Sequence, residues 1–252
     1  MTVSSRVSIV LLASMLVLGG CATTSEEERF SSSMDRAAQI NTQLGVGYMQ
    51  QGQNQLAREK LLRALDQDPR YAPAHRAMAE LYVRLGDPDE AENHYRRSLR
   101  LDSENPETRN NYGVFLCDHG RYGEADRQFR RAAQNRDYST PEYAWTNAGV
   151  CARMDGKDDQ AEEYFRNALR LNPGFHSALI EMGELYYDRG DYARARSFVQ
   201  NFHNVVRPTA RSLWLGVRAA RGVGDHEQAE GFARRLRDDF PNSRETRQLE
   251  DS

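Results

Sequence analysis

The sequence repeats itself at an interval of about 34 residues over most of its length. A small residue marks the first half of each repeat, at Gly45, Ala79, Gly113, Gly149, Gly183 and Gly216. The successive spacings between these positions are 34, 34, 36, 34 and 33 residues. A second small residue follows twelve or thirteen positions later, at Ala57, Ala91, Ala125, Ala161, Ala195 and Ala229. A period of this length is typical of a helical pair that is stacked repeatedly along the chain.

The two sets of small residues have a steric explanation. Paired helices approach closely only where neither side chain at the contact is large, and bulkier apolar residues fill the groove beside it. A glycine recurs where the two helices would be joined, at Gly52, Gly86, Gly120, Gly156 and Gly190. Glycine adopts the left-handed backbone of such turns at little cost. The sequence therefore predicts an all-α fold: a right-handed superhelical solenoid of six tetratricopeptide (helix-turn-helix) repeats, with about twelve helices over residues 37–252.

Several helix starts carry capping signals. Asp87 with Glu90, and Asp225 with Gln228, have the spacing of a capping box. Thr140-Pro141 offers a cap that is followed by proline at the first helical position. These pairs predict helices that begin just after residues 87, 140 and 225.

The first twenty residues have the composition of a secretory signal peptide. Arg6 precedes an apolar run over residues 7–18, which is too short for the roughly twenty residues that span a bilayer. The tetrapeptide Leu18-Gly19-Gly20-Cys21 resembles the lipobox of bacterial lipoproteins. That resemblance implies diacylation of Cys21, and Ala22 after it implies export to the outer membrane. We therefore expect a lipid-anchored protein on the periplasmic face of that membrane.

Residues 21–36 are expected to form the lipidated N-terminus and a flexible tether. The stretch is rich in serine, threonine and glutamate and lacks helical periodicity. Such a tether would hold the folded repeats away from the lipid headgroups.

The composition argues against nucleic acid as a partner. The chain has 34 basic and 37 acidic side chains, a formal net charge of -3, whereas phosphate neutralisation needs a concentrated basic surface. The nucleotide, metalloprotease and hydrolase motifs GxxxxGK[ST], HExxH and GxSxG are absent from the sequence, as is a paired CxxC. The six histidines fall at different repeat positions and predict no shared metal site. We expect no enzyme activity, no cofactor and no small-molecule substrate.

Two cysteines remain beside Cys21. Cys117 and Cys151 lie 34 residues apart, in the first helices of repeats three and four. Neighbouring helices in an oxidising compartment favour a disulfide. Their different positions within the repeat, the twelfth and the tenth, leave two buried free thiols as the alternative.

The inner groove of the solenoid is the expected binding surface. In tetratricopeptide proteins it is lined by set positions of each first helix, and here these positions give a mixed surface with an apolar floor. The residues assigned to the partner-binding groove are Val46, Met49, Glu80, Val83, Asn110, Val114, Thr146 and Val150. The alternative is that some of the valines only pack between repeats.

Three stretches resemble one family in particular. Residues 41–48 (NTQLGVGY), 57–65 (AREKLLRAL) and 110–117 (NNYGVFLC) are similar to the PilF/PilW family of type IV pilus biogenesis lipoproteins. The resemblance extends over the lipobox and all six repeats. It implies a pilotin that binds the secretin subunit and promotes its outer-membrane localisation and multimerisation. The alternative is a scaffold lipoprotein that docks envelope enzymes such as peptidoglycan hydrolases.

Overall fold

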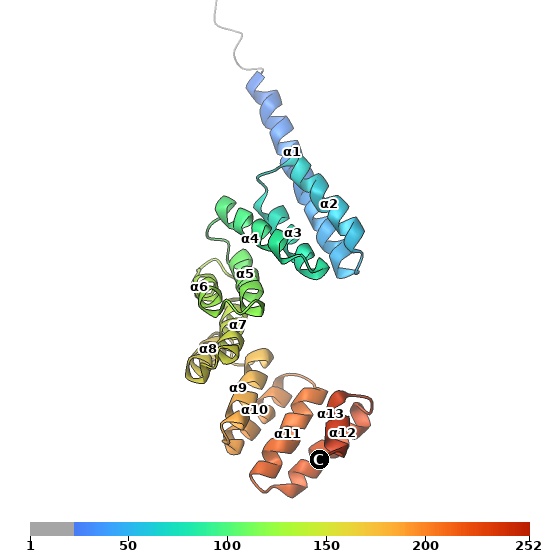
Figure 1. The fold of residues 1–252 in the computed structure, drawn as a ribbon, viewed down its shortest axis with the longest axis vertical. Coiled ribbons are helices and arrows are strands. Elements are labelled where there is room, and N and C mark those ends of the chain that lie inside the picture. Colours follow the sequence, from blue (N-terminus) through green and yellow to red (C-terminus); the bar gives the residue numbers. More distant parts are fainter. Residues whose placement is uncertain (1–22) are drawn as a thin grey trace, which may run out of the picture. The chain divides into compact units, whose positions relative to one another are not determined.

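The computed structural model describes residues 23–252, with side chains from Met34 onward. Within that range the chain forms thirteen helices and no strand. It divides into two compact units between Ala74 and His75. The helices, shown in Figure 1, are α1 (Thr23–Gln50), α2 (Asn54–Gln67), α3 (Ala72–Leu85), α4 (Pro88–Leu101), α5 (Pro106–Asp118), α6 (Tyr122–Ala133), α7 (Pro141–Met154), α8 (Asp158–Leu171), α9 (His176–Asp188), α10 (Tyr192–Val205), α11 (Ala210–Gly222), α12 (His226–Asp239) and α13 (Arg244–Glu250).

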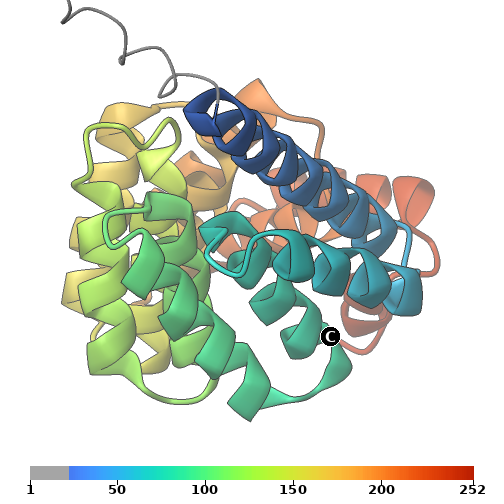
Figure 2. The same ribbon diagram turned by 90° about the horizontal axis from the view of Figure 1, so that it is seen from above.

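The helices pack in consecutive pairs, as the repeat pattern predicts. In the first unit α1 lies beside α2, which is visible in Figure 1 and Figure 2. In the second unit α5 packs on α6, α7 on α8, α9 on α10, and α11 on α12. Each second helix from α4 to α10 also packs on the first helix of the next repeat. The expected all-α tetratricopeptide solenoid is confirmed.

The small residues lie where the paired helices touch. A Cβ atom added to Gly149 would lie 2.4 Å from Phe165 Cε1, and one added to Gly113 would lie 2.7 Å from Phe129 Cε1. These distances are too short for a methyl group, so the large ring on the second helix is accommodated only by glycine on the first. The steric explanation drawn from the sequence is confirmed at both contacts.

The turn glycines adopt the left-handed backbone that was predicted for them. Their φ angles lie between 71° at Gly120 and 77° at Gly224. Gly224 lies 34 residues after Gly190 and completes the set in repeat six, although it is not among the five predicted turn glycines.

Two of the three predicted caps form as hydrogen bonds. The Asp87 carboxylate accepts from Glu90 N at 3.2 Å, and Asp225 accepts from Gln228 N at 3.0 Å. Thr140 precedes Pro141 at the start of α7, but its side chain makes no capping hydrogen bond. The helix begins there because proline has the required φ angle and needs no acceptor for an N–H.

The flexible tether expected over residues 21–36 is wrong for the part that the structure describes. Helix α1 begins at Thr23 and runs without a break into repeat one. Once the first helix of the repeat is formed, each further residue adds one hydrogen bond without a new nucleation cost. Glu26, Glu27, Glu28 and Arg29 are good helix formers and favour this extension. The predicted signal peptide and Cys21 lie outside the described residues.

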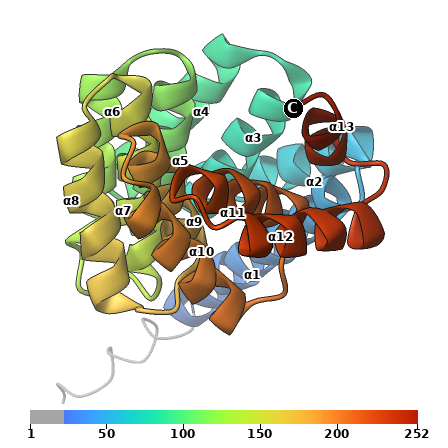
Figure 3. The same cartoon turned by 90° about the horizontal axis from the view of Figure 1, so that it is seen from below.

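A thirteenth helix, beyond the expected twelve, closes the C-terminal end. Ser243 caps α13 by accepting from Thr246 N at 3.1 Å, and Thr246 and Leu249 are buried. Leu249 packs in one cluster with Leu213 and Leu236 from α11 and α12. Figure 3 shows α13 at the end of the chain next to α12. The last repeat of a solenoid has no following neighbour, and α13 covers apolar surface that would otherwise be exposed.

All helices in the described range are too short or too polar to cross a bilayer.

Replacing Gly149 by alanine is expected to lower the free energy of unfolding by about 1–3 kcal/mol, because the new methyl group overlaps the Phe165 ring. Urea unfolding monitored by circular dichroism measures the change. The matched control is Gly123→Ala in α6, where an added Cβ meets no atom within 4 Å. This control is expected to be neutral or stabilising by up to about 1 kcal/mol. Wild-type stability in Gly149→Ala would contradict the packing.

Candidate protein-interaction surfaces

Polar side chains connect the first helices of successive repeats in the second unit. Asn111 Nδ2 on α5 donates to Glu80 Oε1 on α3 at 2.6 Å. Asn147 Nδ2 on α7 donates to Asn110 Oδ1 on α5 at 3.0 Å. We call this surface, together with its continuation on α9 and α11, the first-helix ladder.

The ladder becomes charged toward the C-terminus. Arg153 on α7 lies 3.6 Å from Glu181 on α9, and Arg211 on α11 lies 2.8 Å from the same carboxylate. Arg218 on α11 pairs with Glu184 at 3.1 Å. Both glutamates are largely buried, so arginines from neighbouring repeats compensate for their desolvation.

An aromatic cluster lies at the C-terminal end of the ladder. The Arg218 guanidinium carbon is 4.4 Å from the centroid of the Tyr187 ring and 5.5 Å from that of Trp214. Cation–π contacts of this kind hold the arginine and both rings in one orientation. This end of the face is therefore ordered before any partner binds.

Two predicted groove residues are exposed on the first-helix side. Val83 is 43% exposed and Val114 is 37% exposed. Val114 lies three and four positions after Asn111 and Asn110, so the three residues share one helix face. Val83 likewise follows Glu80 by three positions. Both valines present apolar surface beside satisfied polar groups.

Two other groove residues are buried, contrary to expectation. Met49 is 2% exposed and Thr146 is 5% exposed. The Thr146 hydroxyl donates to Glu142 O at 2.8 Å within its own helix. Position within the repeat fixes the helix face on which a residue lies but not its depth, and these two residues lie too deep to reach a partner.

The remaining four groove residues are half-buried. Val46 and Val150 expose part of their side chains, and Glu80 and Asn110 are engaged in the first-helix ladder. The polar members of the predicted groove therefore stabilise the contacts between repeats. Their partners Asn111 and Asn147 are not among the predicted groove residues. The sequence does contain a signal for these contacts. Asn110 and Asn111 in repeat three and Asn147 in repeat four are polar residues at the same or adjacent positions of the first helix.

The structure joins Cys117 on α5 to Cys151 on α7 as a disulfide, the first of the two alternatives from the sequence. The two Cα atoms are 5.8 Å apart, and both cysteines are buried. Their different positions within the repeat do not prevent the bond, since α5 and α7 pack directly against each other.

A second set of links lies on the second helices. In α4, α6 and α8 the packed alanine is followed by an acidic residue: Glu92, Asp126 and Glu162. Glu92 accepts from Tyr112 Oη at 2.8 Å, and Glu162 accepts from Tyr186 Oη at 2.7 Å. In both cases the tyrosine belongs to the first helix of the following repeat. At this position of the repeat, Glu92 and Glu162 each form a hydrogen bond that links one repeat to the next.

Glu162 binds two arginines in addition to the tyrosine. Burial alone would raise the pKa of Glu162, but hydrogen bonds from Tyr186, Arg166 and Arg189 outweigh it and lower the pKa to about 2. Arg166 Nη2 lies 2.6 Å from Glu162 Oε1, and Arg189 reaches it from the end of α9. Folding therefore favours the ionised form of this side chain.

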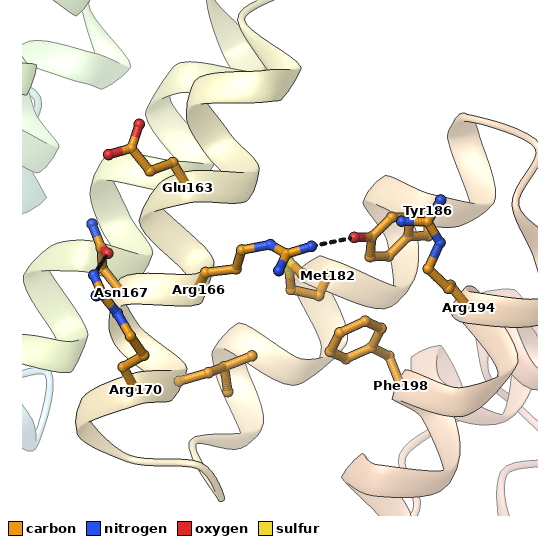
Figure 4. A pocket seen from close by; sticks show the side chains of 9 residues that line it. Glu163, Arg166, Asn167, Arg170, Met182, Tyr186, Arg194 and Phe198 are labelled. Carbon is orange, nitrogen blue, oxygen red and sulfur yellow. Dashed lines mark hydrogen bonds between the residues drawn. The ribbon is translucent and has the colours of Figure 1, made fainter.

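A groove of about 610 Å³ lies between α8, α9 and α10. We call it the α8–α10 groove, and Figure 4 shows it at close range. Apolar side chains form part of its lining, and arginines and other polar residues form the rest. The lining residues are Glu163, Arg166, Asn167, Leu169, Arg170, Met182, Tyr186, Arg194 and Phe198. The repeat pattern indicates no role for this surface, because the predicted groove comprises first-helix positions only.

The histidines offer one contact that their repeat positions did not predict. His75 Nδ1 and His94 Nδ1 lie 3.0 Å apart, and the Tyr82 ring stacks on His94. Burial, with His75 as a further cause, lowers the pKa of His94 to about 4, so it is neutral at pH 7. Within the described part of the chain, His, Cys, Asp and Glu side chains form no group of three that could hold a metal ion.

Replacing Glu162 by glutamine is expected to lower the free energy of unfolding at pH 7 by about 1–3 kcal/mol, because hydrogen bonds to a charged acceptor are lost. A lowered folded-state pKa contributes stability that is complete above the unfolded pKa, about 4.3, and disappears as the pH falls to about 2. Urea unfolding from pH 7 to pH 2.5 should show the difference from wild type shrinking in that window. Glu163→Gln, on the exposed side of α8, is the control. A pH-independent difference would contradict the assignment.

Comparison with known proteins agrees with the repeat architecture. Models of the tetratricopeptide repeat family match residues 36–104, 76–140, 116–174 and 152–201. The chain is 34% identical over 247 residues to the type IV pilus assembly protein PilF of Pseudomonas aeruginosa, covering 97% of this chain and 98% of that protein. An uncharacterised protein of Haemophilus influenzae is 28% identical over 158 residues, covering 63% of this chain and 86% of that protein.

Two solved structures share the fold. The structure of Pseudomonas aeruginosa PilF has a TM-score of 0.76 and 35% identity, covering 86% of this chain and 98% of that one. The crystal structure of PilW, a widely conserved type IV pilus biogenesis factor, has a TM-score of 0.77 and 29% identity, covering 84% and 97%. With the helix pairs and the sequence identity in agreement, the chain belongs to the PilF/PilW family of tetratricopeptide-repeat proteins of type IV pilus biogenesis.

Proposed function

We propose that this protein is an outer-membrane lipoprotein that acts as a pilotin. It binds the secretin subunit of the type IV pilus and promotes the localisation of that subunit to the outer membrane and its multimerisation there. The observation that carries the proposal is 34% identity to PilF over nearly the full length of both chains. Its role is to hold another polypeptide rather than to catalyse a reaction, as tetratricopeptide surfaces commonly do.

The secretin subunit is held on the first-helix side. Val83 and Val114 supply exposed apolar surface there, and Val150 adds partly exposed surface. The first-helix ladder fixes the polar side chains around Val114 by direct hydrogen bonds. A surface whose side chains are already ordered loses less conformational entropy when it binds.

The anchor is a lipid on Cys21, which attaches to the repeats through a helix. Because α1 begins at Thr23, two residues after the cysteine, the link is stiffer than the tether expected from composition. Each buried methylene of an acyl chain contributes about 0.8 kcal/mol, so more than one chain on the terminus holds the protein durably on a membrane. In this proposal the lipid attaches the protein to the membrane, and the repeats bind the secretin subunit.

Replacing Cys21 by serine tests this division of roles. The variant should keep the wild-type melting temperature and still co-purify with the secretin subunit, since the repeats are untouched. Secretin multimers should disappear from the outer-membrane fraction on density-gradient separation, because the variant has no lipid anchor to attach it to that membrane. Thr24→Ser, which retains the cysteine, is the matched control.

Normal amounts of outer-membrane multimers in the Cys21→Ser strain would contradict delivery by the lipid. Recovery of a peptidoglycan hydrolase in place of the secretin from detergent extracts would instead support the scaffold alternative and contradict the pilotin assignment.

A further inference from the structure

We propose that the α8–α10 groove is a second docking site, which takes an acidic segment of a partner protein that carries one or two large apolar side chains. The site is formed by the second helices of repeats four and five, α8 and α10, together with Met182 and Tyr186 of α9, and it shares no residue with the predicted partner-binding groove. The inference goes beyond the proposed function and does not depend on it.

The groove combines an apolar surface with a cationic rim. Leu169 and Phe198 are half-buried at its surface, and Met182 lies beneath them. The lining also includes three arginines and one glutamate, which gives it a formal charge of +2 in a chain whose net charge is -3. A volume of about 610 Å³ has room for one or two large side chains.

Tyr186 holds two of the arginines in place. Arg166 Nη2 donates to Tyr186 Oη at 3.1 Å, and the Arg194 guanidinium carbon lies 4.3 Å from the centroid of the same ring. The Phe198 ring stacks on the Tyr186 ring, with the two centroids 5.6 Å apart and an interplanar angle of 14°. Figure 4 shows Arg166 and Arg194 converging on Tyr186 from α8 and α10. The rim is therefore oriented before a ligand binds.

These arginines are available to an incoming carboxylate. Among the described residues, Arg170 has no carboxylate within ion-pair distance and contacts only the side-chain oxygen of Asn167. Arg166 and Arg194 pair with Glu162 and Asp191 of their own helices, but both arginine side chains are more than half exposed. A guanidinium has five N–H donors, so the exposed edges of Arg166 and Arg194 can also donate to a ligand carboxylate while these pairs remain.

A comparison of the same positions in other repeats shows whether helix pairing requires the residues that line the groove. The residues eight and nine positions after the packed alanine of repeat four are Leu169 and Arg170. In repeat five the corresponding residues are His203 and Asn204, and in repeat three they are Ala133 and Gln134. These repeats form the same helix pairs, so helix pairing does not require the combination found in the groove.

Repeat two is the closest match and supplies a control position. It has Leu99 and Arg100 in the register of Leu169 and Arg170. In the next repeat, however, Glu124 and Gln128 replace the residues that correspond to Arg194 and Phe198. This junction therefore has a mixed charge and lacks the phenylalanine ring, and it should not bind the same segment.

We infer a protein segment as the ligand because the groove is lined by both apolar side chains and arginines. A carboxylate alone would leave Leu169 and Phe198 exposed to water. An apolar side chain alone would give the arginines no carboxylate to bind. An acidic segment with an apolar anchor satisfies both, and burial of one such anchor contributes about 1.5–3 kcal/mol.

The test is fluorescence anisotropy with the full chain in detergent and three labelled peptides. The first has aspartate and glutamate on both sides of a central phenylalanine and leucine, the second has lysine in place of the acids, and the third has alanine in place of the apolar pair. We expect saturable binding of the first peptide only, weakened at least fivefold by Arg170→Glu. Arg100→Glu, at the same register in repeat two, should leave the affinity unchanged.

Arg170 is exposed at the surface of α8, so its replacement should not change the melting temperature, which is measured in parallel. A further variant, Phe198→Ser, should weaken binding of the acidic peptide without altering its salt dependence. No binding of the first peptide, equal binding of the lysine peptide, or equal losses in Arg100→Glu and Arg170→Glu would overturn the proposal. So would binding of phosphatidylglycerol vesicles through Arg170 in the absence of peptide binding.

Discussion

The structure depends on the close approach of two helices within each repeat. Where Gly113 and Gly149 face Phe129 and Phe165, an added methyl group would lie less than 3 Å from the ring. This contact sets the separation of the paired helices, and the phenylalanine ring fills the groove between them. Gly45 meets Leu61 in repeat one and Gly216 meets Phe232 in repeat six at similarly short distances, so the paired helices approach each other in the same manner in these repeats.

Within the second unit, successive repeats are held together on both sides of the stack. Amide and charged side chains link the first helices, and the Cys117–Cys151 disulfide adds a covalent link between α5 and α7. On the second helices, Glu92 and Glu162 bind a tyrosine of the next repeat. A solenoid buries each repeat only against its neighbours, so links of this kind resist local opening of the stack. They also order the surfaces that we propose as docking sites.

Much of the fold was predictable from the sequence because it depends on local patterns. The small residues, the turn glycines and the caps at Asp87 and Asp225 all occur where the repeat period places them. The extent of α1 was not predictable from composition, since a polar segment can extend a helix that tertiary packing has already formed. Helix α13 was missed for a related reason, because it lies outside the repeat and its role is to cover the end of the stack.

The candidate sites were harder to predict than the fold. Repeat position indicated that Val83 and Val114 lie on the first-helix side, and both are exposed. It gave no information on depth, so Met49 and Thr146 were assigned to the groove although they are buried. The Asn110–Asn147 contact and the α8–α10 groove join residues from different repeats, and their distances depend on how neighbouring repeats pack.

The central claim is that the first-helix side holds the secretin subunit, and site-specific photo-crosslinking in cells tests it most directly. A photoreactive phenylalanine analogue is placed at Val83 or Val114, and at Leu62 on α2, which is 44% exposed, as a control. We expect a crosslinked product with the secretin subunit from Val83 and Val114 and none from Leu62. Absence of the product at both valines, or an equal yield from Leu62, would contradict the claim.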